Sequence, residues 1–238
     1  MYASISIISS MATQRVLAEL AAGFERRDGR HVAIESVGGV DAARRVLAGE
    51  AFDAVVLASK VIDELISAGR LVDGSRVDLV RSGVAIAVRA GAARPAIDSE
   101  DAVKRAVLAA RNLGFSTGPS GVHLAKLFER WGIAGEIEGR VVQAPPGVPV
   151  GSLVASGEVE LGFQQLSELM SLPGIDVLGP LPAAIQIITT FSAGLSVASA
   201  QPGAVRELLA FMASADVAAV KRANGMEPAL TGAPGPAG

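Results

Sequence analysis

The sequence predicts an α/β protein with two lobes, each a mostly parallel sheet flanked by helices, joined by two crossover strands. Half of the 238 residues are hydrophobic but only 4% are aromatic, a composition that suits helices packed on a sheet. Short apolar runs alternate along the chain with segments of helical period. Glycine, serine and proline turns separate the two kinds of segment. The chain is also long enough to bury a sizeable core.

The N-terminal part repeats a strand, a polar turn and a helix three times. The strand expected after Asp53 is apolar throughout, as in a strand buried on both faces. Three successive units predict a parallel sheet with right-handed crossovers. The expected strands cover residues 4–9, 31–36 and 53–58, and the expected helices cover 12–24, 42–47 and 61–68.

A second set of units follows a strand over residues 84–88 and a segment without pattern over 91–95. Because that segment ends in proline, we expect the chain to cross there into a second lobe. The second lobe is expected to contain strands 113–116, 140–143, 160–163 and 175–178, and helices 99–110, 150–156, 164–169 and one after Ser120.

The β-branched stretch over residues 185–197 is expected to return to the first lobe as one extended strand. Helices over 204–213 and 216–224 then complete that lobe. The first lobe therefore covers 1–90 and 192–228, the second covers 91–191, and 229–238 is a tail expected to be disordered. Two crossings predict a cleft between the lobes that closes by a hinge motion.

Composition excludes several classes of function. The net charge is −3 with dispersed Lys and Arg, so no nucleic-acid partner is expected. The absence of cysteine excludes disulfides and thiolate chemistry, and we see no metal-ligand cluster, Walker-type phosphate loop or nucleophile elbow. No metal or cofactor is therefore expected. Membrane insertion is not expected either, because residues 183–198 are too polar to span a bilayer.

The apolar start of the chain resembles a first strand more than a signal peptide, since it lacks a preceding Lys or Arg and alternates with serine. A cytoplasmic location is expected if this N-terminus is native, and a periplasmic one if a leader has been removed.

Polar turns after the strands predict an anion site. The carboxyl ends of parallel strands share one edge of a sheet, and exposed N–H groups at helix N-termini favour negative charge. In the segment Gly114 to Trp131, Ser120 is expected to be the N-cap of the helix. The candidate ligand-binding residues are Ser9, Ser10, Gly38, Gly39, Ser59, Ser120, Gly121, Gln164 and Gln165.

The order of these motifs resembles the molybdate-binding proteins of ABC importers, which are type II periplasmic binding proteins. The resemblance extends to about Pro228 and rests on short motifs: Ser9-Ser10, Ser36 to Gly39, Asp53 to Ser59, Gly118 to Gly121 and Gly157 to Phe163. It implies an oxyanion held by serine hydroxyls and backbone N–H groups from both lobes, and an ABC permease as partner if the chain is exported.

Two departures from that family favour an organic carboxylate over a molybdate-type oxyanion. Gly38-Gly39-Val40 stands where the family has a paired serine and glycine, so one hydroxyl donor is lost. Gln164-Gln165 stands at the family's tyrosine position, and an amide can both donate and accept.

The scaffold is also similar to that of aconitate isomerase, which makes catalysis the alternative. A cofactor-free isomerase would shift a proton on a di- or tricarboxylate, with His123 as the base. The interpretation of His123 as a surface or packed histidine is favoured over a catalytic one, because no second histidine or carboxylate stands at a defined spacing. A ligand-sensing domain is a third interpretation, weakened because no DNA-binding region is attached.

Overall fold

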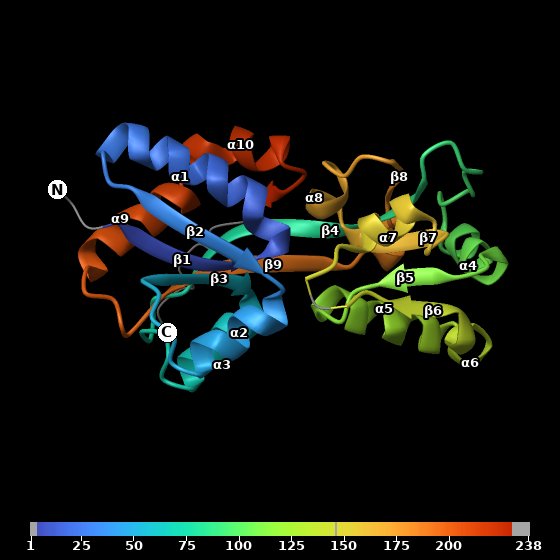
Figure 1. The fold of residues 1–238 in the computed structure, drawn as a ribbon, viewed down its shortest axis with the longest axis horizontal. Helices are drawn as coiled ribbons and strands as arrows, with labels where there is room; N and C mark the ends of the chain where they lie inside the picture. The colour runs from blue at the N-terminus through green and yellow to red at the C-terminus, as the bar shows by residue number, and fades with distance from the viewer. Residues whose placement is uncertain (1–3, 146, 230–238) are drawn as a thin grey trace, which may run out of the picture. The chain divides into compact units, whose positions relative to one another are not determined.

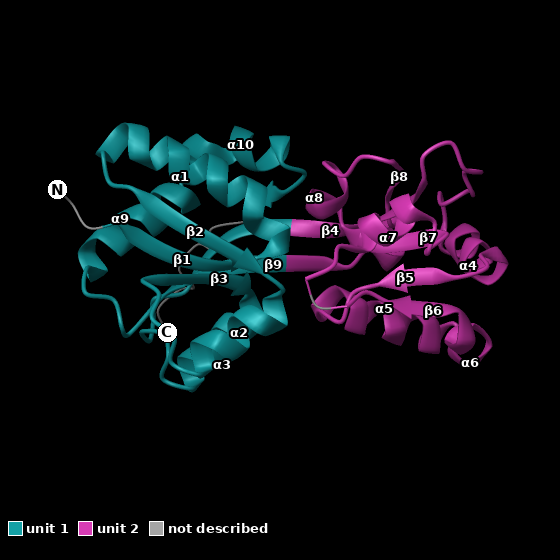
Figure 2. Ribbon diagram, viewed as in Figure 1, with its two compact units in different colours: residues 1–81, 190–238 teal, residues 82–189 magenta. Residues whose placement is uncertain are grey.

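The computed structural model describes residues 4–145 and 147–229. The chain forms two compact units, Met1–Arg81 with Thr190–Gly238 (unit 1) and Ser82–Thr189 (unit 2), which Figure 2 shows in separate colours. No helix among the described residues is both long and apolar enough to cross a membrane.

Unit 1 contains the predicted parallel sheet. Strand β1 (Ile5–Ser10) lies between β2 (Val32–Val37) and β3 (Ala54–Ala58) and is parallel to both, with Ser10 opposite Val37 in β2. Strand β9 (Ile188–Leu195) runs antiparallel to β3, and β10 (Glu227–Pro228) pairs with β4 (Val77–Arg89).

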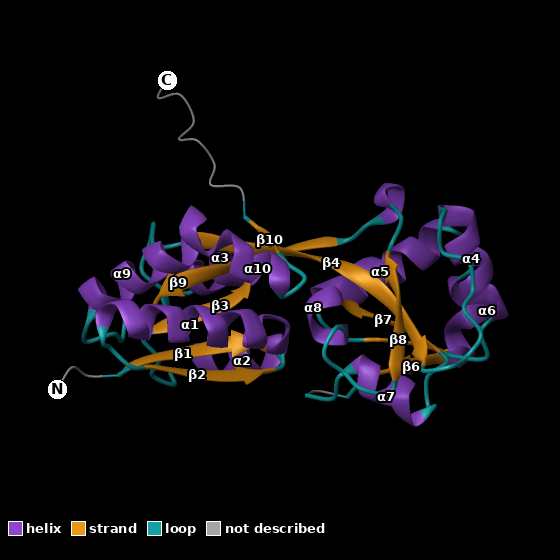
Figure 3. Ribbon diagram, turned by 90° about the horizontal axis from the view of Figure 1, so that it is seen from above, coloured by secondary structure: helices purple, strands orange, loops and turns teal. Residues whose placement is uncertain are grey.

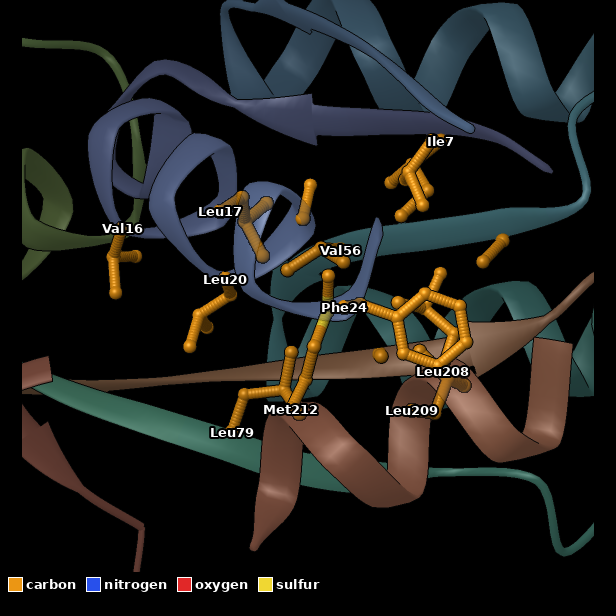
Figure 4. Packing of buried hydrophobic residues seen from close by; sticks show 14 of the residues in the cluster. Ile7, Val16, Leu17, Leu20, Phe24, Val56, Leu79, Leu208, Leu209 and Met212 are labelled. Carbon is orange, nitrogen blue, oxygen red and sulfur yellow. The ribbon is translucent and has the colours of Figure 1, made fainter. Parts of the chain in front are cut away.

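Helices cover both faces of this sheet, and the two faces form separate cores. Ile7 of β1 packs in the core with α1 and α9, whereas Ile8 packs in the core with α2 and α3, because successive strand side chains point to opposite faces. Figure 1 shows α1 on one side of β1 to β3 and α2 and α3 on the other, and Figure 4 shows the core around Phe24 and Met212. The helices and turns are η1 (Met11–Thr13), α1 (Gln14–Asp28), α2 (Gly39–Leu47), α3 (Ser59–Ser67), α9 (Pro202–Ala213), η4 (Ala215–Val217) and α10 (Ala218–Ala223).

Unit 2 is built around a mixed sheet (Figure 3). Strand β4 pairs antiparallel with β7 (Leu161–Gln165) and β8 (Ile175–Pro180), while β5 (Leu113–Phe115) is parallel to both β7 and β6 (Val141–Gln143). The helices and turns are α4 (Glu100–Ala109), α5 (Pro119–Arg130), α6 (Ala134–Ile137), η2 (Glu138–Arg140), α7 (Val150–Ser156), α8 (Leu166–Leu169) and η3 (Ala183–Ile185).

The single strand expected over residues 185–197 is shorter in the structure. The turn η3 precedes it, and β9 begins only at Ile188. The side chain of Gln186 accounts for the difference, because its carbonyl oxygen accepts from the backbone N–H groups of Val84 (2.9 Å) and Ile187 (2.8 Å). These bonds hold the chain in a turn where sequence pattern predicts an extended strand.

The strand expected over residues 84–88 is also longer than predicted, since β4 begins at Val77 and continues through the unit boundary between Arg81 and Ser82. The boundary therefore lies within a strand and not in the proline-containing segment 91–95. Of the expected disordered tail, residues 230–238 lie outside the described residues, and the N–H of Ala229 donates to the carbonyl of Leu79 (3.2 Å).

Candidate anion-binding site

Ser10 and Gly39 meet at the carboxyl edge of the unit 1 sheet. Ser10 ends β1 and Gly39 begins α2, and a Cβ built on Gly39 would lie 3.7 Å from the Cβ of Ser10. The Ser10 hydroxyl is buried and has no hydrogen-bond partner among the described residues. A buried hydroxyl without a partner is costly, so this oxygen is available for a ligand.

Ser9 and Thr13 support the turn that presents Ser10. The Ser9 hydroxyl lies 2.8 Å from that of Ser36 on the neighbouring strand β2. The Thr13 hydroxyl donates to the Ser10 carbonyl at 3.0 Å and is fully buried. Sequence reasoning missed Thr13, although a threonine three residues after a strand-ending serine is a pattern typical of such turns. Ser9 is thus engaged within the protein, while Ser10 is not.

Two helices begin at the same edge without side-chain caps. The N-cap residue of α2 is Gly38, that of α3 is Ala58, and neither helix shows a side-chain cap bond in the described structure. Uncapped first-turn N–H groups carry partial positive charge and bind anions. Ser59 is the first residue of α3 and is half-buried. Ser10, Gly38, Gly39 and Ser59 therefore lie at the ends of three neighbouring parallel strands.

The prediction that Ser120 caps α5 is wrong. Gly118 is the N-cap residue and Pro119 takes the first helical position, where the missing N–H of proline has no intrahelical acceptor to lose. Ser120 is one residue further along and is buried. Gly121 has a packing role, because a Cβ there would lie 1.7 Å from the carbonyl oxygen of Ser116. Glycine thus lets the start of α5 approach the chain that follows β5.

The two glutamines of β7 differ in their hydrogen bonding. Gln164 is fully engaged: its oxygen accepts from the Gly151 N–H (3.1 Å) and its nitrogen donates to Glu168 Oε1 (2.9 Å). Gln165 donates to Thr189 Oγ1 (2.9 Å), but its oxygen is buried with no partner among the described residues. Of the predicted pair, Gln165 is the one with free hydrogen-bonding capacity.

Glu168 has a perturbed acidity that sequence reasoning did not identify. Burial raises the pKa of this carboxyl to about 7, and the hydrogen bond from Gln164 lowers it only in part. The signal in the sequence that could have indicated this pair is a glutamine at the end of a buried strand with a glutamate four residues later.

His123 lies on the exposed side of α5. Its Nδ1 is 2.8 Å from the carbonyl oxygen of Pro119. Because a carbonyl only accepts, the ring proton lies on Nδ1 and the nitrogen is bonded within its own helix. The contacts of this residue are those of a surface histidine.

No group of three His, Asp or Glu side chains within residues 4–145 and 147–229 is arranged to hold a metal ion. Unit 2 carries a surface groove of about 510 Å³ between α5, α6 and β6, lined in part by Phe115, Phe128 and Glu138. A smaller neighbouring hollow of about 270 Å³ includes Gly121.

Comparison with known proteins identifies the family. A family model described as bacterial extracellular solute-binding protein matches residues 5–227. The chain belongs to this family. An aconitate isomerase of a Pseudomonas species is 35% identical over 231 residues, which is 94% of this chain and 88% of that protein.

Solved structures show the same fold. The periplasmic molybdate-binding protein of Azotobacter vinelandii superposes with a TM-score of 0.77 at 20% identity, covering 93% of this chain and 98% of that one. The sulfate-binding protein of Mycobacterium tuberculosis also has a TM-score of 0.77, at 15% identity, covering 97% of this chain and 88% of that one. The solute-binding protein described here therefore has the type II periplasmic-binding-protein fold.

Proposed function

We propose that this solute-binding protein binds a small organic anion through its carboxylate groups, with Ser10 as a central contact. The observation that carries the proposal is the buried Ser10 hydroxyl without a protein partner. It lies beside Gly39, at the edge where α2 and α3 begin without side-chain caps. Hydroxyl and backbone N–H donors at helix N-termini stabilise an anion without a cationic side chain.

Unit 2, taken by itself, carries a second set of residues proposed as ligand contacts: Ser120, Gly121 and Gln165. Ser120 is buried at the start of α5, and Gln165 keeps a free amide oxygen. An amide accepts from a protonated carboxyl or a hydroxyl and can also turn to donate. Such a group suits an organic acid, whose carboxyl and hydroxyl groups offer both kinds of partner. The relative named as an aconitate isomerase supports the same preference.

The test is calorimetry of the protein with molybdate, tungstate, sulfate and a panel of di- and tricarboxylates. We expect a tricarboxylate to bind and to raise the melting temperature. Binding of molybdate or tungstate in preference to every carboxylate would contradict the proposed preference, and binding of none would contradict the function.

Ser10→Ala tests the contact itself. Because hydrogen bonds to charged groups contribute about 1.5–3 kcal/mol, we expect the substitution to weaken binding roughly 10- to 100-fold. Ser67→Ala is the matched control, since Ser67 lies on exposed α3 surface and donates to the Asp63 carbonyl. Equal ligand affinities of the Ser10→Ala and Ser67→Ala variants would show that Ser10 does not contact the ligand.

The second candidate function is a cofactor-free isomerase of an unsaturated di- or tricarboxylate. It is favoured by the aconitate isomerase relative, which matches over most of both chains. The same donors would hold the carboxylates and stabilise the enolate-like charge that develops when a neighbouring C–H proton is removed. Incubation with cis- and trans-aconitate in D₂O tests it: interconversion with uptake of solvent deuterium supports catalysis, and recovery of unchanged substrate contradicts it for this pair.

If the chain serves import, an ABC permease is its proposed partner. Co-purification with an ABC permease would support transport. Neighbouring genes for breakdown of organic acids would instead favour the isomerase.

A further inference from the structure

Glu168 lies at the edge of unit 2 where an anion would be stabilised. Strands β5 and β7 are parallel, so their carboxyl ends share one edge of the sheet. The twelve-residue helix α5 begins after β5 with Ser120 buried in its first turn. Glu168 is the third residue after β7, in α8, and is partly exposed to solvent. Helix α5 packs on the face of β4 that carries Val84 and Ile86, and α8 packs on the face that carries Ala85 and Ala87. The carboxyl and the N-terminus of α5 therefore approach the same edge of the sheet from opposite faces.

The side chain of Gln164 orients the Glu168 carboxyl. Gln164 receives a hydrogen bond from the Gly151 N–H and donates to Glu168 Oε1 at 2.9 Å. With both its oxygen and one N–H bonded, the amide has a fixed orientation and holds one oxygen of the carboxyl. Gln164 bonds Oε1 and not the second oxygen, Oε2, so the proton transfer is assigned to Oε2.

The surroundings of Glu168 are otherwise apolar. Its neighbours Leu166 and Leu169 pack on Ala85 and Ala87 of β4 and on β8. The titratable residues of those strands are Asp78, Arg81, Arg89 and Asp176. None of them is a cause of the pKa shift of Glu168, which has burial as its main cause and Gln164 as its opposing one. A carboxyl with a pKa of about 7 is half protonated near neutral pH and can both take and return a proton.

We propose that Glu168 is the acid–base residue that moves the proton in the isomerisation, with Gln164 as its positioning residue. This inference rests on the isomerase candidate described under Proposed function. It differs from the sequence-based hypothesis, in which His123, an exposed residue of α5, is the base.

The step is a balanced proton shift. The Glu168 carboxylate takes a proton from the substrate CH₂ beside a carboxylate, that C–H bond breaks, and its electron pair shifts the double bond by one position. The resulting carboxylic acid returns the proton to the carbon at the far end of the former double bond. No oxidant, reductant or co-reactant is needed, and the glutamate ends as it began.

Three variants test the assignment. Glu168→Gln keeps the shape and the bond to Gln164 but cannot take a proton, so we expect kcat for aconitate isomerisation to fall about 10²- to 10⁴-fold with aconitate binding retained by calorimetry. Glu168→Asp is expected to recover part of the lost rate. Glu158→Gln is the control, because Glu158 is exposed in the same unit, and its activity should match the unmodified protein.

The pH profile separates a catalytic role from a structural one. In the unmodified protein we expect kcat/KM to rise with pH through about 7 as Glu168 becomes a carboxylate, and Glu168→Gln should lack this limb. An unmodified protein that catalyses no exchange would overturn the isomerase function together with this role. An active protein in which Glu168→Gln keeps both rate and pH limb would overturn the role of Glu168 alone.

Discussion

At the residue scale, two polar groups in this protein have an energetic cost in the folded state that a ligand or a proton relieves. The Ser10 hydroxyl lacks a partner among the described residues, and the Glu168 carboxyl is held where ionisation is unfavourable. Groups of this kind are typical of functional sites, because selection for binding opposes selection for stability. Each leads to a stability measurement that needs no knowledge of the ligand.

Ser10→Ala is expected to leave the unliganded protein as stable as before or to stabilise it. The substitution removes an unsatisfied hydroxyl, whose burial costs about 1–3 kcal/mol, and leaves the backbone unchanged. Urea unfolding without ligand measures this free energy. Ser9→Ala is the matched comparison and should destabilise, because Ser9 shares a hydrogen bond with Ser36. Destabilisation by Ser10→Ala as large as by Ser9→Ala would argue for an unseen structural role.

Glu168 is expected to make the protein less stable as pH rises. Its folded pKa of about 7 lies above the reference value of 4.5, so the folded state binds more protons between those values and stability falls across that window. The full effect is roughly 3 kcal/mol, from about 1.4 kcal/mol for each pKa unit. Unfolding free energies at pH 5 and pH 8 measure it, and Glu168→Gln should show a smaller difference. If the unfolding free energy changed by the same amount between pH 5 and pH 8 in the unmodified protein and in Glu168→Gln, the Glu168 carboxyl would have to be exposed to solvent.

At the element scale, glycine decides how closely helix α5 approaches its strand. Gly121 lies in the first turn of α5, where an added Cβ would meet the Ser116 carbonyl oxygen. Sequence pattern alone predicts Gly121 to be a ligand-binding residue, because glycine after a strand is typical of anion-binding turns. Its closest neighbour shows that the packing of α5 also requires it.

Gly121→Ala is expected to destabilise the protein by about 2 kcal/mol or more, since overpacking forces backbone shifts. Gly135→Ala in α6 is the control, because a Cβ there meets nothing within 4 Å, and it should be neutral or mildly stabilising. Thermal unfolding of both variants measures the contrast. Equal melting temperatures would mean that α5 shifts freely away from Ser116.

At the scale of the whole molecule, residues far apart in the sequence close unit 1. Asp53 at the start of β3 accepts hydrogen bonds from the backbone N–H and hydroxyl of Ser6, from the Ser199 hydroxyl at 2.6 Å and from Gln201. Burial opposes ionisation of Asp53, but these donors together hold its pKa below the usual value. One carboxylate thus joins the first strand to the segment that returns from unit 2.

Asp53→Ala is expected to cost about 2–4 kcal/mol, because Ser6, Ser199 and Gln201 lose a shared charged acceptor. The lowered pKa means that this stabilisation is present above the reference value of 3.8 and is lost as pH falls through the lower folded value. Acid unfolding followed by circular dichroism measures this. Asp73→Ala is the control, since the hydrogen bond of the exposed Asp73 side chain seen among the described residues is from the adjacent Gly74 N–H. An unchanged acid transition in Asp53→Ala would contradict the prediction.

Sequence pattern by itself determined the class of fold and the order of its units. Local period and turn residues predict strands and helices because each depends on near neighbours in the chain, and they placed β1, β2 and β3 with their following helices. They also located Ser10, Gly38 and Gly39 at one sheet edge, which follows from parallel pairing. Their role as ligand contacts stays a prediction.

Only the tertiary structure decided which polar groups are free. Gln164 and Gln165 are indistinguishable in sequence, yet one is fully bonded by Gly151 and Glu168 while the other keeps an unpaired oxygen. The acidity of Glu168 and the turn at Gln186 likewise depend on groups brought together by folding. Hydrogen-bond satisfaction and burial are properties of neighbours in space, and local sequence pattern does not determine those neighbours.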